Sequence, residues 1–259
     1  FNKYFNAEIL KKMKITKKEK KFLGVSINSK EVKKANLFVA IKGKKKDGHN
    51  FLNQAIRKGA SFCIVSKTRN KIKEKCIKVK NTKAFLDKFA YLKRSQSNAK
   101  IIAVTGSSGK TTVKTLIAKI LSEFKPTHYS PKSFNNHYGV PLSLSNLEQN
   151  HSFGVFEVGM SKAGEIGNLS KLVRPDVAII TNIAAAHIEN FKNLKGIANA
   201  KGEIINNINK GGTLILNKDD KYFRYFQKKA FKRNIKVNSF GISSNADIKL
   251  LKIKKHKDK

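Results

Sequence analysis

The sequence has few cysteines, no long apolar run and few acidic residues. Cys63 and Cys76 are the two cysteines among 259 residues, and they have neither metal-ligand spacing nor the numbers of a disulfide framework. We therefore expect two idle or buried thiols in a reducing cytosol. No apolar run approaches the roughly 20 residues of a membrane helix, and no secretory pattern is present. These absences predict a cytoplasmic protein without membrane insertion.

Acidic residues are scarce, because 17 Asp and Glu stand against 55 Lys and Arg, a formal net charge of +38. Such a charge is compatible with a nucleic-acid-binding protein. The basic residues are mostly lysines, however, and they are spread along the whole chain rather than gathered in one arm or helix. We therefore expect no specific nucleic-acid partner. The positive field should favour anionic substrates such as nucleotides and should weaken with salt.

The apolar pattern predicts an α/β fold in two parts. Forty per cent of the residues are hydrophobic, which is enough for a packed core. Short apolar runs and turns over residues 1–81 predict a small N-terminal α/β domain. Residues 82–259 predict a P-loop domain with a doubly wound, mostly parallel sheet, because strands alternate with helices there. The predicted strands are 37–41, 61–65, 101–104, 153–158, 177–181 and 213–216, and the predicted helices include 53–58, 82–94 and 194–206.

A glycine-rich loop lies between a predicted strand and a predicted helix at residues 105–112, Thr-Gly-Ser-Ser-Gly-Lys-Thr-Thr. Glycines let backbone N–H groups turn around an anion, and the helix N-terminus adds further donors. The spacing is tighter than the general P-loop pattern, because Val104 stands where the first glycine would be. We predict that the loop binds ATP and that its threonine holds Mg²⁺. The predicted residues are Gly106, Ser107, Ser108, Gly109, Lys110, Thr111 and Thr112.

A P-loop alone does not identify a reaction. Three further side chains are candidates for the same edge of the sheet, beyond the carboxyl ends of its strands. Glu157 ends an apolar run, and ligands of doubly wound sheets bind beyond the carboxyl ends of strands, so its carboxylate is a candidate Mg²⁺ ligand. His187 follows another predicted strand, and its spacing leaves a structural role and a ligand role equally open. Lys201 is one of dozens of lysines and carries no signal of its own.

With these residues, the chain resembles the Mur ligase family of peptidoglycan synthesis. Within that family it is most similar to the branch that joins D-alanyl-D-alanine to a UDP-N-acetylmuramoyl tripeptide. The resemblance runs through nearly the whole chain and is far more specific than any single motif. It lies in residues 37–43, 47–51, 105–112, 133–142, 157–160, 164–166, 174–176, 181–183, 185–187, 200–204 and 216–220.

The resemblance implies an ATP-dependent amide-bond ligase of the bacterial cytoplasm. ATP phosphorylates the terminal carboxylate of the tripeptide, and the amine of D-alanyl-D-alanine attacks the acyl phosphate with release of ADP and phosphate. Cations must neutralise the anions that meet in this reaction. The resemblance implies one Mg²⁺ on Thr111 and Glu157, and a second on His187 and a carbamylated Lys201. A carbamate offers two hard oxygens, whereas an ammonium cannot ligate a metal.

The resemblance also implies further site residues. Either Asn135 or Asn136 positions the acyl phosphate, and the motif does not say which; with Lys110, His187 and Lys201, we take Asn136 as the catalytic candidate. The family's Asp-Ser-Arg segment is replaced here by Asn-Ser-Lys at residues 28–30. The chain therefore lacks, at this position, the planar guanidinium group that can bind a diphosphate through paired hydrogen bonds. The remaining candidates are Asn182 for the nucleotide, and Ser29, Asp47 and His49 for the UDP end of the substrate.

The family has a C-terminal domain and an Asn-containing adenine-binding segment that are not visible before Lys259. We therefore expect the N-terminal and central domains only, as a monomer that is inactive as a ligase by itself. Because the first residue is Phe1 rather than methionine, we expect a natural N-terminus that differs from this one.

Two alternatives stay open. The first is a sister ligase, either the enzyme that adds the third residue of the muramoyl peptide or a folylpolyglutamate synthetase. The second is a basic P-loop module that binds nucleic acid with a steep salt dependence and no dependence on a UDP-muramoyl peptide.

Overall fold

A computed structural model describes residues 8–11, 22–67, 70–186, 188–242 and 245–252, and their contacts divide the chain into two units. The first unit comprises Phe1–Asn98 and Tyr138–His151, and the second comprises Ala99–His137 and Ser152–Lys259. This division differs from the expected one between residues 81 and 82. Helices α3 (Thr82–Ser95) and α5 (Gly139–Ser145) pack on each other in the first unit.

The first unit contains a parallel sheet whose described strands follow the order β1-β2-β3-β4. One apolar cluster joins this sheet to helix α2 and includes Phe38, Leu52 and Cys63. Both cysteines are free and buried, as expected. The strands are β1 (Gly24–Ser26), β2 (Asn36–Val39), β3 (Phe62–Val65) and β4 (Cys76–Lys78), and the further helices are η1 (Gly48–Phe51), α2 (Leu52–Arg57) and η2 (Asn70–Lys75), of which η1 and η2 are 3-10 helices.

Two asparagine side chains explain how α3 and α5 join this unit. Asn81 caps α3, because its side chain accepts a hydrogen bond from the backbone N–H of Ala84. Asn146 follows α5 and bonds both backbone groups of Val25 in β1, with distances of 2.9 Å to the nitrogen and 3.0 Å to the oxygen. A side-chain amide thus takes the place of a neighbouring strand at the edge of the sheet.

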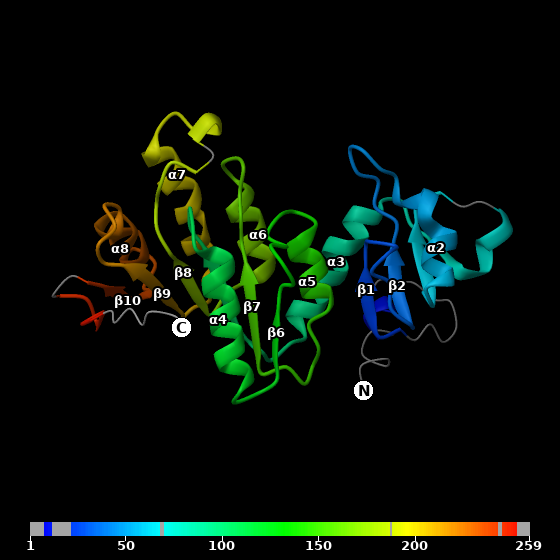
Figure 1. The fold of residues 1–259 in the computed structure, drawn as a ribbon, viewed down its shortest axis with the longest axis horizontal. Coiled ribbons are helices and arrows are strands. Elements are labelled where there is room, and N and C mark those ends of the chain that lie inside the picture. Colours follow the sequence, from blue (N-terminus) through cyan, green and yellow to red (C-terminus); the bar gives the residue numbers. More distant parts are fainter. Residues whose placement is uncertain (1–7, 12–21, 68–69, 187, 243–244, 253–259) are drawn as a thin grey trace, which may run out of the picture. The chain divides into compact units, whose positions relative to one another are not determined.

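The second unit contains a parallel sheet whose described strands follow the order β11-β10-β9-β8-β5-β7-β6 (Figure 1). The strands are β5 (Lys100–Thr105), β6 (Thr127–Tyr129), β7 (Phe153–Glu157), β8 (Val177–Ile180), β9 (Thr213–Asn217), β10 (Lys236–Gly241) and β11 (Ile248–Lys249). The helices are α4 (Lys110–Ser122), α6 (Glu165–Val173), η3 (Ile188–Asn190), α7 (Leu194–Lys201), η4 (Gly202–Asn207) and α8 (Phe223–Phe231). The expected α/β fold class with mostly parallel sheets is therefore confirmed.

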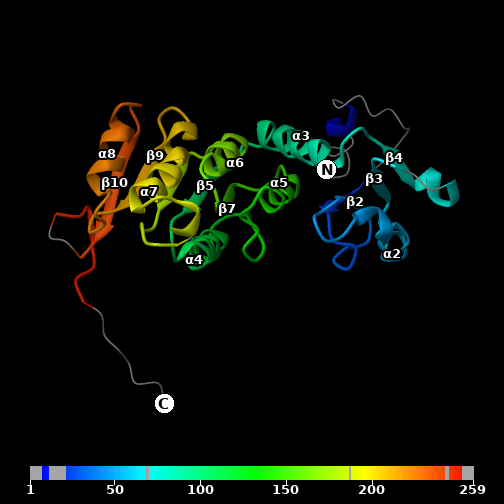
Figure 2. The same ribbon diagram turned by 90° about the horizontal axis from the view of Figure 1, so that it is seen from above.

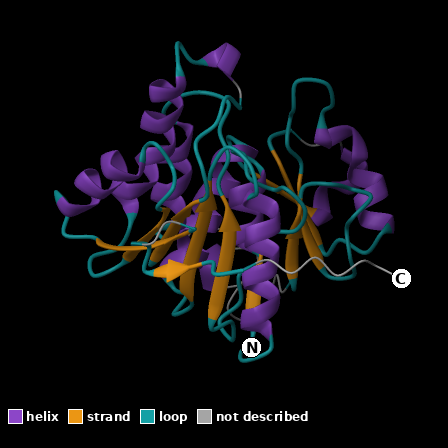
Figure 3. Cartoon of the chain, turned by 60° about the vertical axis from the view of Figure 1, so that its left-hand side comes forward, coloured by secondary structure: helices purple, strands orange, loops and turns teal. Residues whose placement is uncertain are grey.

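The connections of this sheet place a ligand site at the carboxyl end of β5. Helix α4 leads from β5 toward the β6 edge, whereas α6 leads from β7 back across β5 to β8. Helix α4 consequently covers one face of the sheet, and α6 and α8 lie on the other (Figure 2). The central strands all end at the same edge, where the loops gather (Figure 3). A reversal of strand order beside β5 is the position at which α/β sheets bind ligands.

The predicted strands agree with β2, β3, β5, β7, β8 and β9 within one or two residues. The helix expected over residues 194–206 instead changes at Gly202 from the α-helix α7 to the 3-10 helix η4. Within the described part of the chain, no helix has the length and apolar content needed to cross a membrane.

Candidate active site

The P-loop follows β5 directly and depends on two glycines. Gly106 has φ +148° and Gly109 has φ +77°, conformations that favour glycine. A Cβ on Gly106 would lie 1.9 Å from the hydroxyl oxygen of Thr181, so no larger residue fits there. Helix α4 begins at Lys110, and the N–H groups of its first turn have no partners within the helix. The loop and this helix start together form a cradle for an anion.

The segment after β8 supports the P-loop through several hydrogen bonds. The backbone N–H of Ser107 donates to the carbonyl of Asn182 at 2.9 Å, and that of Ser108 donates to the Asn182 side-chain oxygen at 3.1 Å. The hydroxyl of Thr181 donates to the carbonyl of Ser108 at 2.6 Å. Asn182, expected to contact the nucleotide, is thus engaged in holding the loop in this structure.

Two lysines converge on one carbonyl oxygen of the loop. Lys110 Nζ donates to the carbonyl of Gly106 at 2.9 Å and to that of Ser107 at 3.1 Å. Lys201 Nζ also donates to the carbonyl of Gly106 at 2.9 Å, and the Lys201 residue is 2% exposed. Burial, and then the charge of Lys110, lowers the pKa of Lys201 from 10.5 to about 8. About a tenth of its amine is therefore neutral at pH 7.

Glu157 brings together the side chains on the other side of the loop. Its residue is 1% exposed, and its Oε2 accepts a hydrogen bond from the hydroxyl of Thr111 at 2.7 Å. Its Oε1 accepts one from the Asn135 amide at 2.7 Å. Burial lowers the pKa of Lys110 and Lys114, and the Glu157 carboxylate opposes both shifts. The buried carboxylate of Glu157 thus interacts electrostatically with Lys110 and Lys114 in the first two turns of α4.

Thr111 and Glu157 fit the needs of Mg²⁺ in a nucleotide complex. Among the described residues there is no group of three or more His, Cys, Asp or Glu side chains that could hold a metal by themselves. Mg²⁺ at a nucleotide is commonly held by one or two protein oxygens, with phosphates and waters completing its shell. A hydroxyl and a carboxylate 2.7 Å apart beside the P-loop provide such a donor pair.

A cavity of about 490 Å³ opens beside Lys110. Asn135 and Asn136 both line it, but they differ in their surroundings. Asn135 is half-buried and bonded to Glu157, whereas Asn136 is exposed. Glu165 and Asn168 also line the cavity. Of the two candidates that the motif left open, Asn136 is therefore the one more accessible to a substrate.

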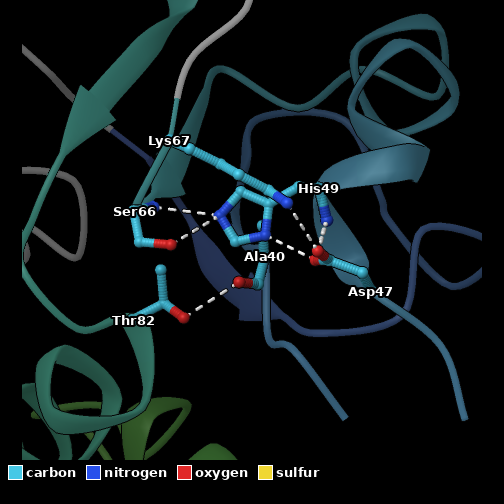
Figure 4. A network of polar contacts seen from close by, with 6 residues as sticks. All are labelled: Ala40, Asp47, His49, Ser66, Lys67 and Thr82. Atoms are coloured by element: carbon cyan, nitrogen blue, oxygen red, sulfur yellow. Dashed lines mark hydrogen bonds and ion pairs between the residues drawn. The ribbon is translucent and has the colours of Figure 1, made fainter.

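The substrate candidates of the first unit lie in closed polar networks. His49 is 6% exposed, and its Nε2 accepts the N–H of Ser66 at 2.9 Å, so Nδ1 carries the proton and donates to Asp47 at 2.6 Å (Figure 4). Burial raises the pKa of the Asp47 carboxyl, but hydrogen bonds from His49 and Lys67 outweigh it and hold that pKa well below its usual range. Ser29, which is 7% exposed, donates to the Gln54 side chain at 2.6 Å.

The order Asp47, His49, Ser66 is that of a catalytic triad, yet the geometry excludes that chemistry here. The lone pair on Nε2 already accepts the backbone N–H of Ser66, so it is not available to take the hydroxyl proton. The network instead ties the loop before η1 to the end of β3. His187, the remaining candidate, lies outside the described residues.

Two side chains that support the site were not predicted from the sequence. Lys114 is buried beneath the loop that carries Asn135, and the signal for it is its place one helical turn after Lys110. Glu203 accepts hydrogen bonds from the N–H groups of Gly164 at 2.7 Å and Gly167 at 2.8 Å, at the start of α6. A carboxylate at a helix N-terminus is stabilising, and here it links the Lys201 region to the cavity wall.

Comparison with known proteins gives two family matches. Residues 104–259 match the Mur ligase middle domain, and residues 21–102 match the Mur ligase family, catalytic domain. The chain is similar to UDP-N-acetylmuramoyl-tripeptide--D-alanyl-D-alanine ligase from Rickettsia prowazekii, with 39% identity over 231 residues that cover 88% of this chain and 51% of the relative. The chain thus spans about half the length of that curated relative.

Solved structures agree with these matches. A crystal structure of MurF from Acinetobacter baumannii is 32% identical, has a TM-score of 0.78, and is matched over 91% of this chain and 53% of its own. MurF ligase from Thermotoga maritima in complex with ADP is 33% identical, has a TM-score of 0.71, and is matched over 85% of this chain and 51% of its own.

The lowered pKa of Lys201 predicts a pH dependence of stability. Between pH 8 and pH 10.5 the unfolded state binds more protons at this residue than the folded state. The free energy of unfolding should therefore rise over this interval, by up to about 3 kcal/mol. Lys201→Met should remove that part of the rise in urea titrations made at several pH values in CO₂-free buffer. The matched control is Lys195→Met, which changes an exposed lysine of the same helix and should keep the wild-type slope. Equal slopes of the free energy of unfolding against pH in the two variants would contradict the assignment of this rise to Lys201.

Proposed function

The chain belongs to the Mur ligase family, and we propose that it forms the nucleotide-binding part of a ligase that joins D-alanyl-D-alanine to a UDP-N-acetylmuramoyl tripeptide. The observation that carries this proposal is the meeting of a P-loop, the Thr111–Glu157 pair and Lys201 at the carboxyl end of β5. The name of the Rickettsia prowazekii relative supports the choice of substrates.

The first step is the transfer of a phosphoryl group from ATP to the tripeptide carboxylate. The N–H groups at the start of α4 bind the phosphates. The Lys110 ammonium, which donates hydrogen bonds to the carbonyls of Gly106 and Ser107 in this structure, donates to phosphate oxygens instead. Thr111 and Glu157 would hold Mg²⁺, which would neutralise charge on the phosphates.

The carboxylate that receives the phosphoryl group enters the cavity beside Lys110. Two anions must approach each other there, so the ammonium of Lys110 and the amide of Asn136 reduce their repulsion and fix the reacting carboxylate. The amine of the dipeptide then attacks the acyl phosphate, and phosphate leaves as the amide forms.

Lys201 is the proposed site of a carbamate. Its neutral amine attacks CO₂, which forms a nitrogen–carbon bond and releases one proton, and the product is a carbamate anion. The lowered pKa of Lys201 favours this reaction because the neutral amine is the reactive form. Carbamate formation also replaces the positive ammonium beside Lys110 with a negative group. Together with His187, the carbamate oxygens would hold a second Mg²⁺.

The first unit is proposed to bind the UDP end of the substrate, and the enzyme is proposed to be a cytoplasmic monomer. Ser29, Asp47 and His49 act there through the loops that they hold, since their polar atoms are already bonded within the protein. The exposed lysines favour such an anionic substrate.

Phosphate release by the whole gene product that contains these residues tests the proposed reaction. Release should require Mg²⁺, ATP, the UDP-muramoyl tripeptide and D-alanyl-D-alanine together. Lys110→Ala should lower kcat/KM on the order of a hundredfold to a thousandfold, because it removes a cation from the transferring phosphate. Lys119→Ala, on the exposed side of the same helix, should retain activity. Release driven by a single amino acid, or by a folate with glutamate, would replace this proposal with a sister ligase.

Carbamate formation is tested by carbon NMR in ¹³C-bicarbonate. Wild-type protein should give one carbamate signal that fades as pH falls below 7, because protonation of the amine reverses the reaction. Lys201→Met should abolish the signal, and Lys195→Met should keep it. A signal that persists in Lys201→Met would assign the carbamate to another amine.

A further inference from the structure

Lys114 is a buried cation that the proposed reaction does not use. It lies one helical turn after Lys110 on α4 and is 1% exposed. Its Nζ donates to the carbonyl of Ser130 at 2.7 Å and to that of Lys132 at 2.7 Å. A buried ammonium is costly unless it is fully paired, so these two bonds account for how the charge is tolerated.

The two carbonyls belong to a segment that leaves the sheet. Strand β6 ends at Tyr129, and the backbone N–H of Ser130 still donates to the carbonyl of Val155 at 3.1 Å. The chain then turns away, and Lys132 adopts φ +49°, a left-handed conformation that is uncommon outside glycine. Such a conformation persists where the surroundings hold it, and the Lys114 ammonium binds the carbonyl of that residue.

The segment held in this way contacts both candidate Mg²⁺ ligands. The Ser130 hydroxyl accepts the backbone N–H of Glu157 at 3.2 Å, and the Asn135 amide donates to the Glu157 carboxylate at 2.7 Å. The hydroxyl of Ser133 lies 3.2 Å from that of Thr111. The backbone of Asn135 is fixed in turn, because its carbonyl accepts the N–H of Gly159 at 2.8 Å.

We propose that Lys114 is a positioning residue for the Mg²⁺ site. By binding the carbonyls of Ser130 and Lys132, it fixes the turn from which Ser133 and Asn135 hold Thr111 and Glu157 at their separation. This inference rests on the proposed function, in which those two residues bind the metal of a nucleotide. Lys114 touches neither nucleotide nor metal and acts through the 130–135 segment.

A lysine that only stabilised the core would affect nucleotide binding with and without metal alike. A positioning lysine has a selective effect, because the N–H groups of the P-loop and the Lys110 side chain do not depend on the 130–135 segment. The gain in nucleotide affinity that Mg²⁺ confers therefore distinguishes a positioning role from a purely stabilising one.

The test is binding of a fluorescent ADP analogue to the whole gene product, first in EDTA and then in a Mg²⁺ titration. In EDTA, Lys114→Met should bind the analogue within about twofold of wild type. Its apparent affinity for Mg²⁺ should fall about 10- to 100-fold, the range typical for residues that orient metal ligands. Lys119→Met removes a charge from the exposed side of the same helix and should behave as wild type.

Lys114→Gln provides a second variant if Lys114→Met does not fold, since it keeps hydrogen-bond donors without the charge. It should show a smaller loss of Mg²⁺ affinity of the same kind. Equal losses in EDTA and in Mg²⁺, or an unchanged Mg²⁺ affinity in a folded variant, would overturn the inference alone. If wild type binds no nucleotide, or gains nothing from Mg²⁺, the proposed function fails and the inference falls with it.

Discussion

The buried carboxylate of Glu157 is the group around which the rest of the site is arranged. It ends β7 at the carboxyl edge of the sheet and accepts hydrogen bonds from Thr111 and Asn135. It also opposes the lowering of the Lys110 and Lys114 pKa values that burial causes. An isolated buried carboxylate would be unstable, and the buried ammonium of Lys114 likewise depends on its partners. Lys110, Lys114 and the 130–135 segment therefore all interact with one carboxylate.

Burial beside the phosphate loop, rather than number, sets two lysines apart from the others. The chain has 55 Lys and Arg, and most lysines are exposed. Lys114 and Lys201 are at most 2% exposed, and both bind backbone carbonyls beside the phosphate loop. Such an arrangement suits a site that must attract ATP and a carboxylate, because its cations are already desolvated and held in place. The positive surface adds attraction at long range, and salt weakens that contribution.

Sequence alone predicted the elements whose signal is local. The P-loop, β5 and the position of Glu157 follow from glycine spacing and from apolar runs that end in polar residues. Helix α5 escaped prediction because it begins with Gly139 and contains Pro141, and its packing on α3 was also not predicted. Lys114 was not predicted, although it lies one helical turn after Lys110, because only the turn after β6 supplies the carbonyls that bury it. The closed network of His49 depends on Ser66, 17 residues away, which no local pattern indicates.

That Thr111 and Glu157 hold the metal of a bound nucleotide is the proposal on which the others depend. Its most direct test is electron paramagnetic resonance of Mn²⁺, used in place of Mg²⁺, with ADP bound to wild-type protein and to Glu157→Gln. We expect a Mn²⁺ signal that depends on both ADP and protein, and a Mn²⁺ affinity at least about tenfold weaker in the variant, while ADP binding in EDTA is retained. Equal Mn²⁺ affinity in wild type and Glu157→Gln would contradict it.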